Sequence, residues 1–191
     1  FAHSHGAPIQ SRSERLKSAN PADYAPISRV EEQWKYTTAD QLAGLSDAGV
    51  GEYLGDIDTK LGTGASCSWI ASTNELFGAA GLPEDLVSAV AWQAAEQAYL
   101  VDIAATDEQS ITTISLHATD KSPAAMHTVV RAQRHANAVV ILDHTGDAVF
   151  AENIEESALG LGDHRRRLVD QVPGGLVDQR ELPFHAQGLP G

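Results

Sequence analysis

The segment Asp143-His144-Thr145-Gly146-Asp147 combines side chains of the types that transfer protons or bind metals in enzymes. An aspartate that orients a histidine could make it a general base, as in a catalytic triad. Neighbours in a strand point to opposite faces, however, so adjacent residues rarely build such a site. Asp and Thr side chains also bond nearby backbone, and Gly146 can take a positive φ. Because the apolar run 139–142 ends just before the segment, we favour a turn.

Three further histidines, His117, His127 and His135, follow one another at spacings of ten and eight residues. In a solenoid this spacing could stack them on one face as a ladder of metal ligands. Surface histidines and hydrogen-bonded strand histidines are commoner, and we favour that interpretation. His3 could help to chelate Cu(II) if Phe1 were a free amino terminus, but the start of the chain looks trimmed.

The other candidate groups also favour structural roles. Cys67 has no base near it in sequence, so we expect a buried and inert thiol. The paired carboxylates Glu31-Glu32 and Glu155-Glu156 are expected on solvated faces. The chain has no phosphate-binding glycine loop, no nucleophile elbow and no HExxH zinc motif. We therefore assign no catalytic residue and no metal ligand, and we identify no cofactor-binding residue.

The composition argues against several classes of function. A net charge of −13, from 26 acidic and 13 basic residues, repels phosphate backbones, so nucleic acid is not an expected partner. No window approaches the roughly 18 apolar residues of a transmembrane helix, and we expect no membrane partner. A single cysteine excludes an internal disulfide framework and a cysteine cage, and it fits a reducing, cytoplasmic compartment.

The first half of the chain is expected to be helical. Residues 1–25 have the composition of a flexible arm. Over 26–104 the predicted elements are helices, interrupted by a glycine-rich, irregular stretch at 46–80, and the family resemblance described below implies that 26–104 is an N-terminal helical domain. Two capping boxes predict short helices over 29–36 and 39–45. Pro83 and the acids after it open an amphipathic helix of about sixteen residues that ends near Tyr99.

In the second half of the chain the spacing of the apolar residues changes from that of helices to that of strands. Over 105–156, β-forming residues recur in short runs separated by polar turns, which is typical of a sandwich, a barrel or a β-solenoid. Residues 157–191 differ again in composition. Three consecutive arginines are followed by a segment rich in proline and glycine, and the pattern typical of strands stops. We expect no packed structure in this tail.

Three segments resemble landmarks of one family, in the family's order. Pro26-Ile27-Ser28-Arg29 with Glu31 to Thr37 is similar to the R-x-E-x-W-R-[FY]-T segment near the start of SufD-type proteins. Gly81 to Asp85, followed by a helix, looks like the next landmark. Leu142 to Gly146 with Phe150-Ala151-Glu152-Asn153 looks like the third. Together they cover roughly residues 10–156.

The resemblance implies a subunit of the SUF iron–sulfur cluster assembly complex, from the SufB/SufD family. It implies an α+β chain in which a small helical domain leads into the first coils of a right-handed parallel β-helix, with the Asp-His-Thr-Gly segment at a β-helix corner. The implied partners are a SufB-like sister scaffold and the SufC-like ATPase. The subunit is implied to be a scaffold and not an enzyme, and the complex, not this fragment alone, assembles the cluster.

This sequence departs from the family after Glu156, where many more coils are expected. A frame change in the encoding DNA would explain the foreign tail, and the chain is then an N-terminal fragment. No catalytic or ATPase-binding residue can be carried over, because those positions lie beyond the match. A truncated β-helix would expose an unpaired edge, so we expect marginal stability or aggregation.

Two other classes of function remain open. One is a β-solenoid enzyme, such as an acyltransferase or a sugar-acting protein, that uses His117, His127 or His144. It would need a hexapeptide-type repeat of aliphatic residues, which the chain lacks. The other is a stand-alone binding module.

Overall fold

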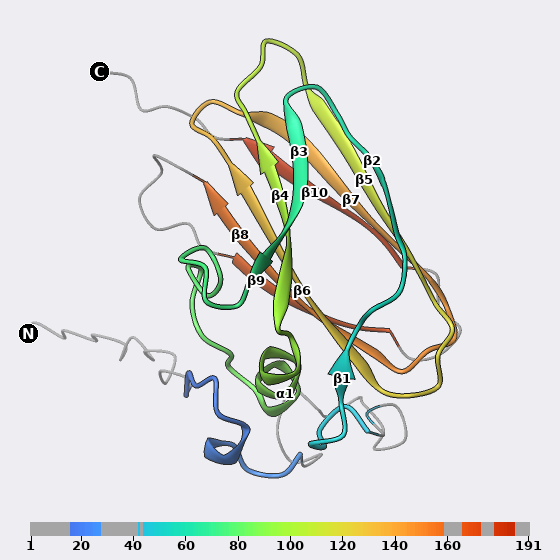
Figure 1. The fold of residues 1–191 in the computed structure, drawn as a ribbon. Coiled ribbons are helices and arrows are strands. Elements are labelled where there is room, and N and C mark those ends of the chain that lie inside the picture. Colours follow the sequence, from blue (N-terminus) through green and yellow to red (C-terminus); the bar gives the residue numbers. More distant parts are fainter. Residues whose placement is uncertain (1–15, 28–41, 43, 159–165, 173–177, 186–191) are drawn as a thin grey trace, which may run out of the picture.

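The structure is a computed structural model that describes residues 16–27, 42, 44–158, 166–172 and 178–185 (Figure 1). These residues form one α-helix, one short 3-10 helix and ten strands. The elements are η1 (Pro21–Asp23), β1 (Gly51–Glu52), β2 (Ile57–Lys60), β3 (Ala65–Ala71), α1 (Leu86–Ala94), β4 (Gln97–Ile103), β5 (Ser110–Ala118), β6 (Ala124–Ala132), β7 (Asn137–Gly146), β8 (Phe150–Ala158), β9 (Arg166–Val172) and β10 (Asp178–His185). No helix in this described part is long and apolar enough to cross a bilayer.

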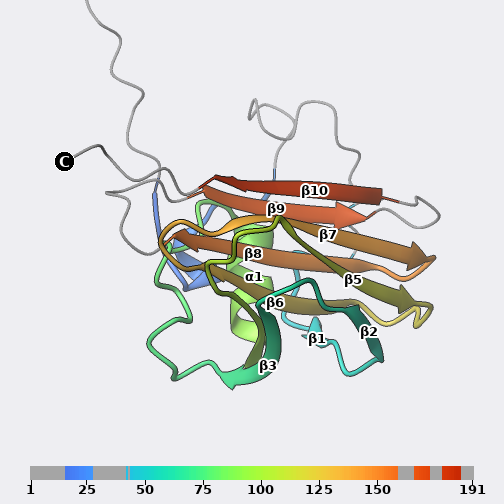
Figure 2. The same ribbon diagram turned by 90° about the horizontal axis from the view of Figure 1, so that it is seen from above.

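The strands form two sheets, and the chain alternates between them from β4 to β8 (Figures 1 and 2). One sheet has the order β3-β4-β6-β8-β9, with β1 paired to β6, and the other has the order β10-β7-β5-β2. Within the first, β4, β6 and β8 run parallel; within the second, β5 and β7 run parallel. His117 and Thr145, 28 residues apart in sequence, therefore lie side by side on neighbouring strands.

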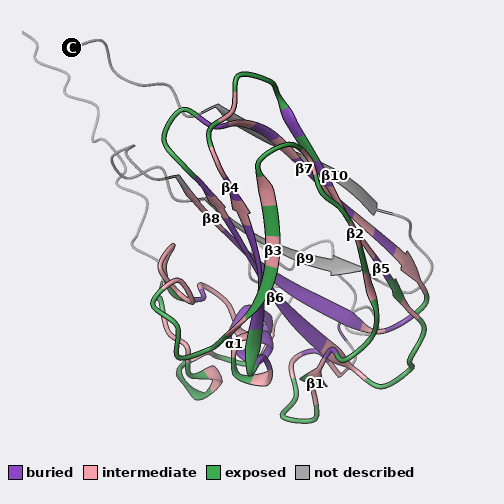
Figure 3. Cartoon of the chain, turned by 45° about the horizontal axis from the view of Figure 1, so that its top comes forward, coloured by how far each residue is buried: buried purple, intermediate pink, exposed green. Residues whose placement is uncertain are grey.

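An apolar core fills the space between the two sheets. In β7 buried residues alternate with half-buried ones, as expected for a strand with one face on a core. β6 is instead buried along most of its length, because its outer face is covered as well (Figure 3). The largest side chains of the inner core are Tyr53, Tyr99, Val101, Ile103, Ile114, Leu116, Met126, Val130, Val140, Leu142, Phe150 and Ile154.

The outer face of the larger sheet is covered by α1 and by the segment 72–81. Val87 and Ala91 of the helix form one apolar cluster with Ala125 and Ala151 of the sheet. Residues Leu76 and Phe77 of the segment pack on a second cluster over β4 and β6. The sheet therefore has a core on each of its two faces, which explains why β6 and β8 have so few exposed positions.

The amphipathic helix is shorter than its sequence period predicts. α1 ends at Ala94, Ala95 is already extended, and the chain continues as β4. The apolar residues after Ala95 are buried on both faces of the sheet: Ala98 packs outward and Tyr99 inward. A strand buried on both faces reads as a continuous apolar run, which periodicity alone does not separate from the end of a helix.

The expected helical domain over 26–104 is also corrected. Its described residues hold strands β1 to β4 and a single α-helix, so this region contributes edge strands and one covering helix to the sheets. The predicted helix over 29–36 lies outside the described residues, as does most of the one over 39–45. The parallel stack begins at β4, before the predicted boundary at residue 105.

The tail after residue 157 contains two strands, contrary to the expectation of no packed structure. β9 pairs antiparallel with β8, and β10 pairs antiparallel with β7. At the opposite edges β3 and β2 pair antiparallel with β4 and β5. Both sheets are therefore mixed, and the expectation of a right-handed parallel β-helix stays a prediction.

The alternation of β5 provides a test of the two-sheet core. Ile114 is completely buried between the sheets, whereas Ile111 on the same strand is 53% exposed. Ile114→Ala should lower the free energy of unfolding by about 2–5 kcal/mol through lost burial and a residual cavity. The matched Ile111→Ala should change it by no more than about 0.5 kcal/mol. Urea unfolding measures both, and equal effects would contradict this packing.

A buried histidine–glutamate network as candidate functional site

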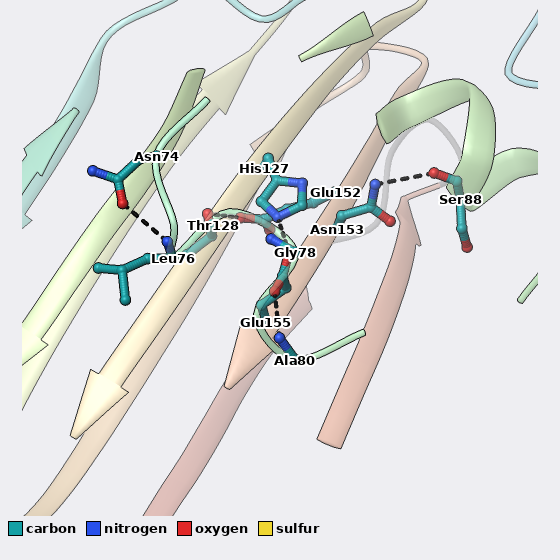
Figure 4. A network of polar contacts seen from close by, with 10 residues as sticks. All are labelled: Asn74, Leu76, Gly78, Ala80, Ser88, His127, Thr128, Glu152, Asn153 and Glu155. Atoms are coloured by element: carbon teal, nitrogen blue, oxygen red, sulfur yellow. Dashed lines mark hydrogen bonds and ion pairs between the residues drawn. The ribbon is translucent and has the colours of Figure 1, made fainter. Parts of the chain in front are cut away.

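The polar residues that the fold buries gather where β6 and β8 pair. Parallel pairing sets His127 opposite Asn153 and Thr128 opposite Ile154. Since successive strand residues point to opposite faces, His127 lies outward beneath the covering layer while Thr128 lies inward. On β8 the same alternation places Glu155 outward and Glu152 inward. The strand pair therefore carries two polar networks, one on each face (Figure 4).

The outer network joins a histidine, a glutamate and the segment 72–81. His127 Nε2 lies 2.6 Å from Glu155 Oε1, and both side chains are at most 1% exposed. The backbone N–H of Gly78 donates to Oε1 of the same carboxylate at 2.8 Å, and that of Ala80 donates to Oε2 at 3.0 Å. Figure 4 shows the carboxylate between the imidazole and these two N–H groups.

Aromatic rings close the outer network from above. Phe77 stacks on the His127 imidazole with a centroid distance of 4.0 Å and an interplanar angle of 24°. Trp92 of α1 meets the same imidazole edge-on at 5.0 Å, and it also meets Phe77 edge-on at 4.8 Å. The imidazole therefore contacts the rings of Phe77 and Trp92 and the carboxylate of Glu155.

The protonation of Glu155 follows from these contacts. Burial, the largest influence, raises the pKa of the carboxyl, but the hydrogen bond and charge of His127 and the N–H groups of Ala80 and Gly78 lower it. The lowering influences prevail, so the pKa lies below its usual value and the group is a carboxylate at neutral pH. A carboxylate only accepts hydrogen bonds, so His127 donates through Nε2.

The inner network links the two sheets across the core. Thr128 Oγ1 donates to Glu152 Oε1. His144 reaches over from β7 and places Nε2 2.9 Å from Glu152 Oε2. The two atoms are close, but the contact does not meet the geometric criteria of a hydrogen bond. Glu152 is fully buried, and of its two carboxyl oxygens Oε1 accepts a hydrogen bond from Thr128 while Oε2 lies near the His144 imidazole.

A third polar contact fastens the helix to the sheet. Asn153 Nδ2 donates to the backbone oxygen of Ser88 at 3.1 Å, and both residues are completely buried. Asp85 caps the same end of α1, since its carboxylate accepts from the Ser88 N–H at 2.8 Å. The helix that carries Trp92 is therefore fixed over His127 by side chains of β8 and by its own cap.

The structure corrects the interpretation of 143–147 as a turn. β7 continues to Gly146, so Asp143, His144 and Thr145 are strand residues. The chain turns only afterwards: Gly146 has φ +110°, and a Cβ there would collide with the backbone oxygen of Ala118. Asp147 is exposed and pairs with Lys121. His144 points into the core and joins the inner network, so these neighbours do not form a catalytic triad.

The three spaced histidines do not form a ladder. His117 lies on β5 and contacts Thr145 Oγ1 through Nδ1 at 2.9 Å. His127 lies in the other sheet, and His135 sits at positive φ in the turn before β7. Among the described residues, no three His, Cys, Asp or Glu side chains are grouped so that they could hold a metal ion.

Glu155 overturns the expectation of a solvated carboxylate pair, because it is buried and paired.

Cys67 is half-buried on β3. The pKa of its thiol is raised, because the effect of burial outweighs a hydrogen bond with Tyr99 that acts in the opposite direction. His3 and Glu31-Glu32 lie outside the described residues. The sequence analysis did not identify Glu152 as a buried residue. The signal was its position two residues from both Phe150 and Ile154, which places it on the same inward face of the strand.

Glu155 tests whether the outer network stabilises the fold. Glu155→Gln should lower the free energy of unfolding at pH 7 by about 3 kcal/mol, because a buried pair loses its charge and the amide NH2 meets N–H donors. The folded pKa lies below the ordinary value of 4.5, so this contribution is complete above 4.5. It is lost as the pH falls through the folded pKa, and the two proteins should then converge.

The matched control is Glu108→Gln, which alters an exposed carboxylate. It should leave the free energy of unfolding within about 0.5 kcal/mol of the unaltered chain at every pH. Urea unfolding between pH 7 and pH 3 measures both variants. A pH-independent loss in Glu155→Gln would show that the carboxylate charge is not what stabilises the network.

Comparison with known proteins gives one consistent family. A Mycobacterium leprae protein described as an iron–sulfur cluster assembly SufBD family protein is 28% identical over 129 residues, which is 65% of this chain and 33% of that protein. A Mycobacterium tuberculosis protein of the same description is 28% identical over 130 residues, 65% of this chain and 32% of its own length. No family model and no solved structure matches the chain. The chain spans about a third of the length of these relatives, and the similarity supports a distant relationship to the SufB/SufD family that does not distinguish SufD from SufB.

Proposed function

We propose that this chain is part of a scaffold subunit for iron–sulfur cluster assembly, acting in the cytoplasm with a SufB-like sister scaffold and a SufC-like ATPase. The observation that carries the proposal is the similarity over 65% of the chain to proteins described as iron–sulfur cluster assembly SufBD family members. The order of the three SufD-type segments favours a SufD-like subunit over a SufB-like one.

The strand arrangement supports a right-handed parallel β-helix as the fold of the longer protein. Strands β4, β6 and β8 stack in parallel on one side and β5 and β7 on the other. Such a stack grows by adding coils, each of which buries its inner face on the core and its edge on the preceding coil. Right-handed crossovers are by far the commoner hand for parallel strands.

The two buried networks support a structural and not a catalytic role for this chain. His127 and His144 are almost completely buried, and each contacts a buried glutamate. A general base must reach its substrate, and neither imidazole has a surface position from which to do so. In this proposal the iron–sulfur cluster is the product of the whole complex, and this chain alone binds no cofactor.

Co-expression tests the proposed function. The tagged chain is produced with the SufB-like and SufC-like proteins of its own genome, and the purified material is analysed by size-exclusion chromatography and for bound iron and sulfide. The chain should retain the SufB-like partner, since the family's ATPase-binding positions lie beyond the matched residues. A folded chain that elutes alone, in the presence of both partners, would contradict the proposal.

A matched variant removes the ambiguity of a failed fold. Ile111→Ala changes an exposed side chain on β5 and serves as the folded reference, whereas Ile114→Ala weakens the core. Retention should fall with Ile114→Ala only if folding is impaired, as followed by circular dichroism. A partner retained equally by the folded chain and by a chain unfolded in its core would be binding non-specifically.

A further inference from the structure

The last two described strands pair with both sheets at once. β9 lies antiparallel along β8, from Phe150 opposite Val172 to Glu156 opposite Arg166. β10 lies antiparallel along β7, from Asn137 opposite His185 to His144 opposite Asp178. β9 and β10 thus supply the outermost described strand of each sheet at the same end of the stack (Figure 2).

This position is the one at which a parallel stack would otherwise continue. β7 and β8 are the last parallel strands of their sheets, and their outer edges present backbone N–H and C=O groups. An unpaired edge of this kind is a template for another strand, from a further coil or from a second molecule. In this fold the antiparallel strands β9 and β10 already satisfy those groups.

We propose that strands β9 and β10 act as an intramolecular cap, which pairs with the edges of β8 and β7 and excludes any further strand from them. The cap replaces the exposed edge that the sequence predicts for a truncated solenoid. It prevents the described stack from pairing with a second molecule through these two edges. The proposal rests on strand pairing and not on the function proposed above.

The sequence of the cap suits an outermost strand. Pro183 lies within β10 and has no N–H to offer a further strand, and proline inside a sheet is found essentially on edge strands. β9 begins with Arg166 and Arg167, and charged residues on edge strands hinder pairing with another molecule.

The opposite end of the stack is closed in the same manner. β2 pairs antiparallel with β5 in one sheet, and β3 pairs antiparallel with β4 in the other. These two strands are consecutive in the chain, as β9 and β10 are. Each end therefore carries a two-strand segment that gives one antiparallel strand to each sheet, and the parallel strands lie between the two segments.

Disulfide trapping tests the pairing in the full chain. Asp143 is half-buried on the outer face of β7, and its register partner on β10 is Gln179. In a Cys67→Ser background, Asp143→Cys with Gln179→Cys should form a disulfide on mild oxidation, because opposite residues of an antiparallel pair lie within reach of one. Peptide mass spectrometry without reduction measures the yield.

The matched control moves one cysteine by one residue. Asp143→Cys with Arg180→Cys should give at least about tenfold less intramolecular disulfide, since a shift of one position turns a strand residue to the opposite face. Equal yields for the two pairs would show that the segment is not paired in this register, and would overturn the cap.

The consequence for association is tested with proline. Leu168→Pro with Val169→Pro, and Arg180→Pro with Glu181→Pro, remove adjacent N–H groups, so that one of each pair necessarily faces the stack. Amide exchange in β7 and β8 should accelerate at least about tenfold while β4 and β6 stay protected, and light scattering should detect self-association. A control with Gln187→Pro and Gly188→Pro, which follow the last described strand in sequence, should stay monomeric and protected. A four-proline variant with unchanged exchange in β7 and β8, or an unaltered chain that already associates through these edges, would overturn the proposal.

Discussion

The parallel pairing of β6 with β8 is the constraint on which the rest of the structure depends. It brings His127 beside Glu155 on the outer face and Thr128 beside Glu152 on the inner face. Through Glu155 the pairing fixes the segment 72–81, and through Asn153 it fixes α1. A shift of one residue in this register would exchange the two faces of a strand and leave every buried carboxylate facing the wrong partners.

We infer that the outer network favours one register of β6 against β8. Taking a carboxylate out of water costs several kcal/mol, and the hydrogen bonds recover this cost only when the geometry is complete. Glu155 is complete, because an imidazole and two backbone N–H groups surround it. A slipped register would bury the same charge without them. The apolar cores supply the attraction between the layers, and the buried charges select one register among the possible ones.

The sequence predicts β6 and β7, whose β-branched runs are visible in it, but it places the start of β4 at the end of a helix. It does not predict which polar residues are buried. His127 and Glu155 are 28 residues apart in sequence, and their contact follows only from the register of β6 against β8, which the sequence does not reveal. The turn expected at Asp143 fails for a related reason: an inward histidine on a strand looks, in sequence, like part of a polar loop. The arginines and prolines of residues 157–191 led us to expect no packed structure there. Charged residues and proline are, however, also common on edge strands.

A cap and a partner would compete for one edge. If β10 and β9 occupy the edges of β7 and β8, a sister scaffold or a further coil cannot add strands there until the cap is displaced. Displacement would cost the fifteen strand pairings that the two registers describe, so binding would have to replace them with an equivalent set. A partner that binds the capped chain must therefore use another surface. Partner retention by the proline variants compared with the unaltered chain then reports whether the cap and the partner exclude each other.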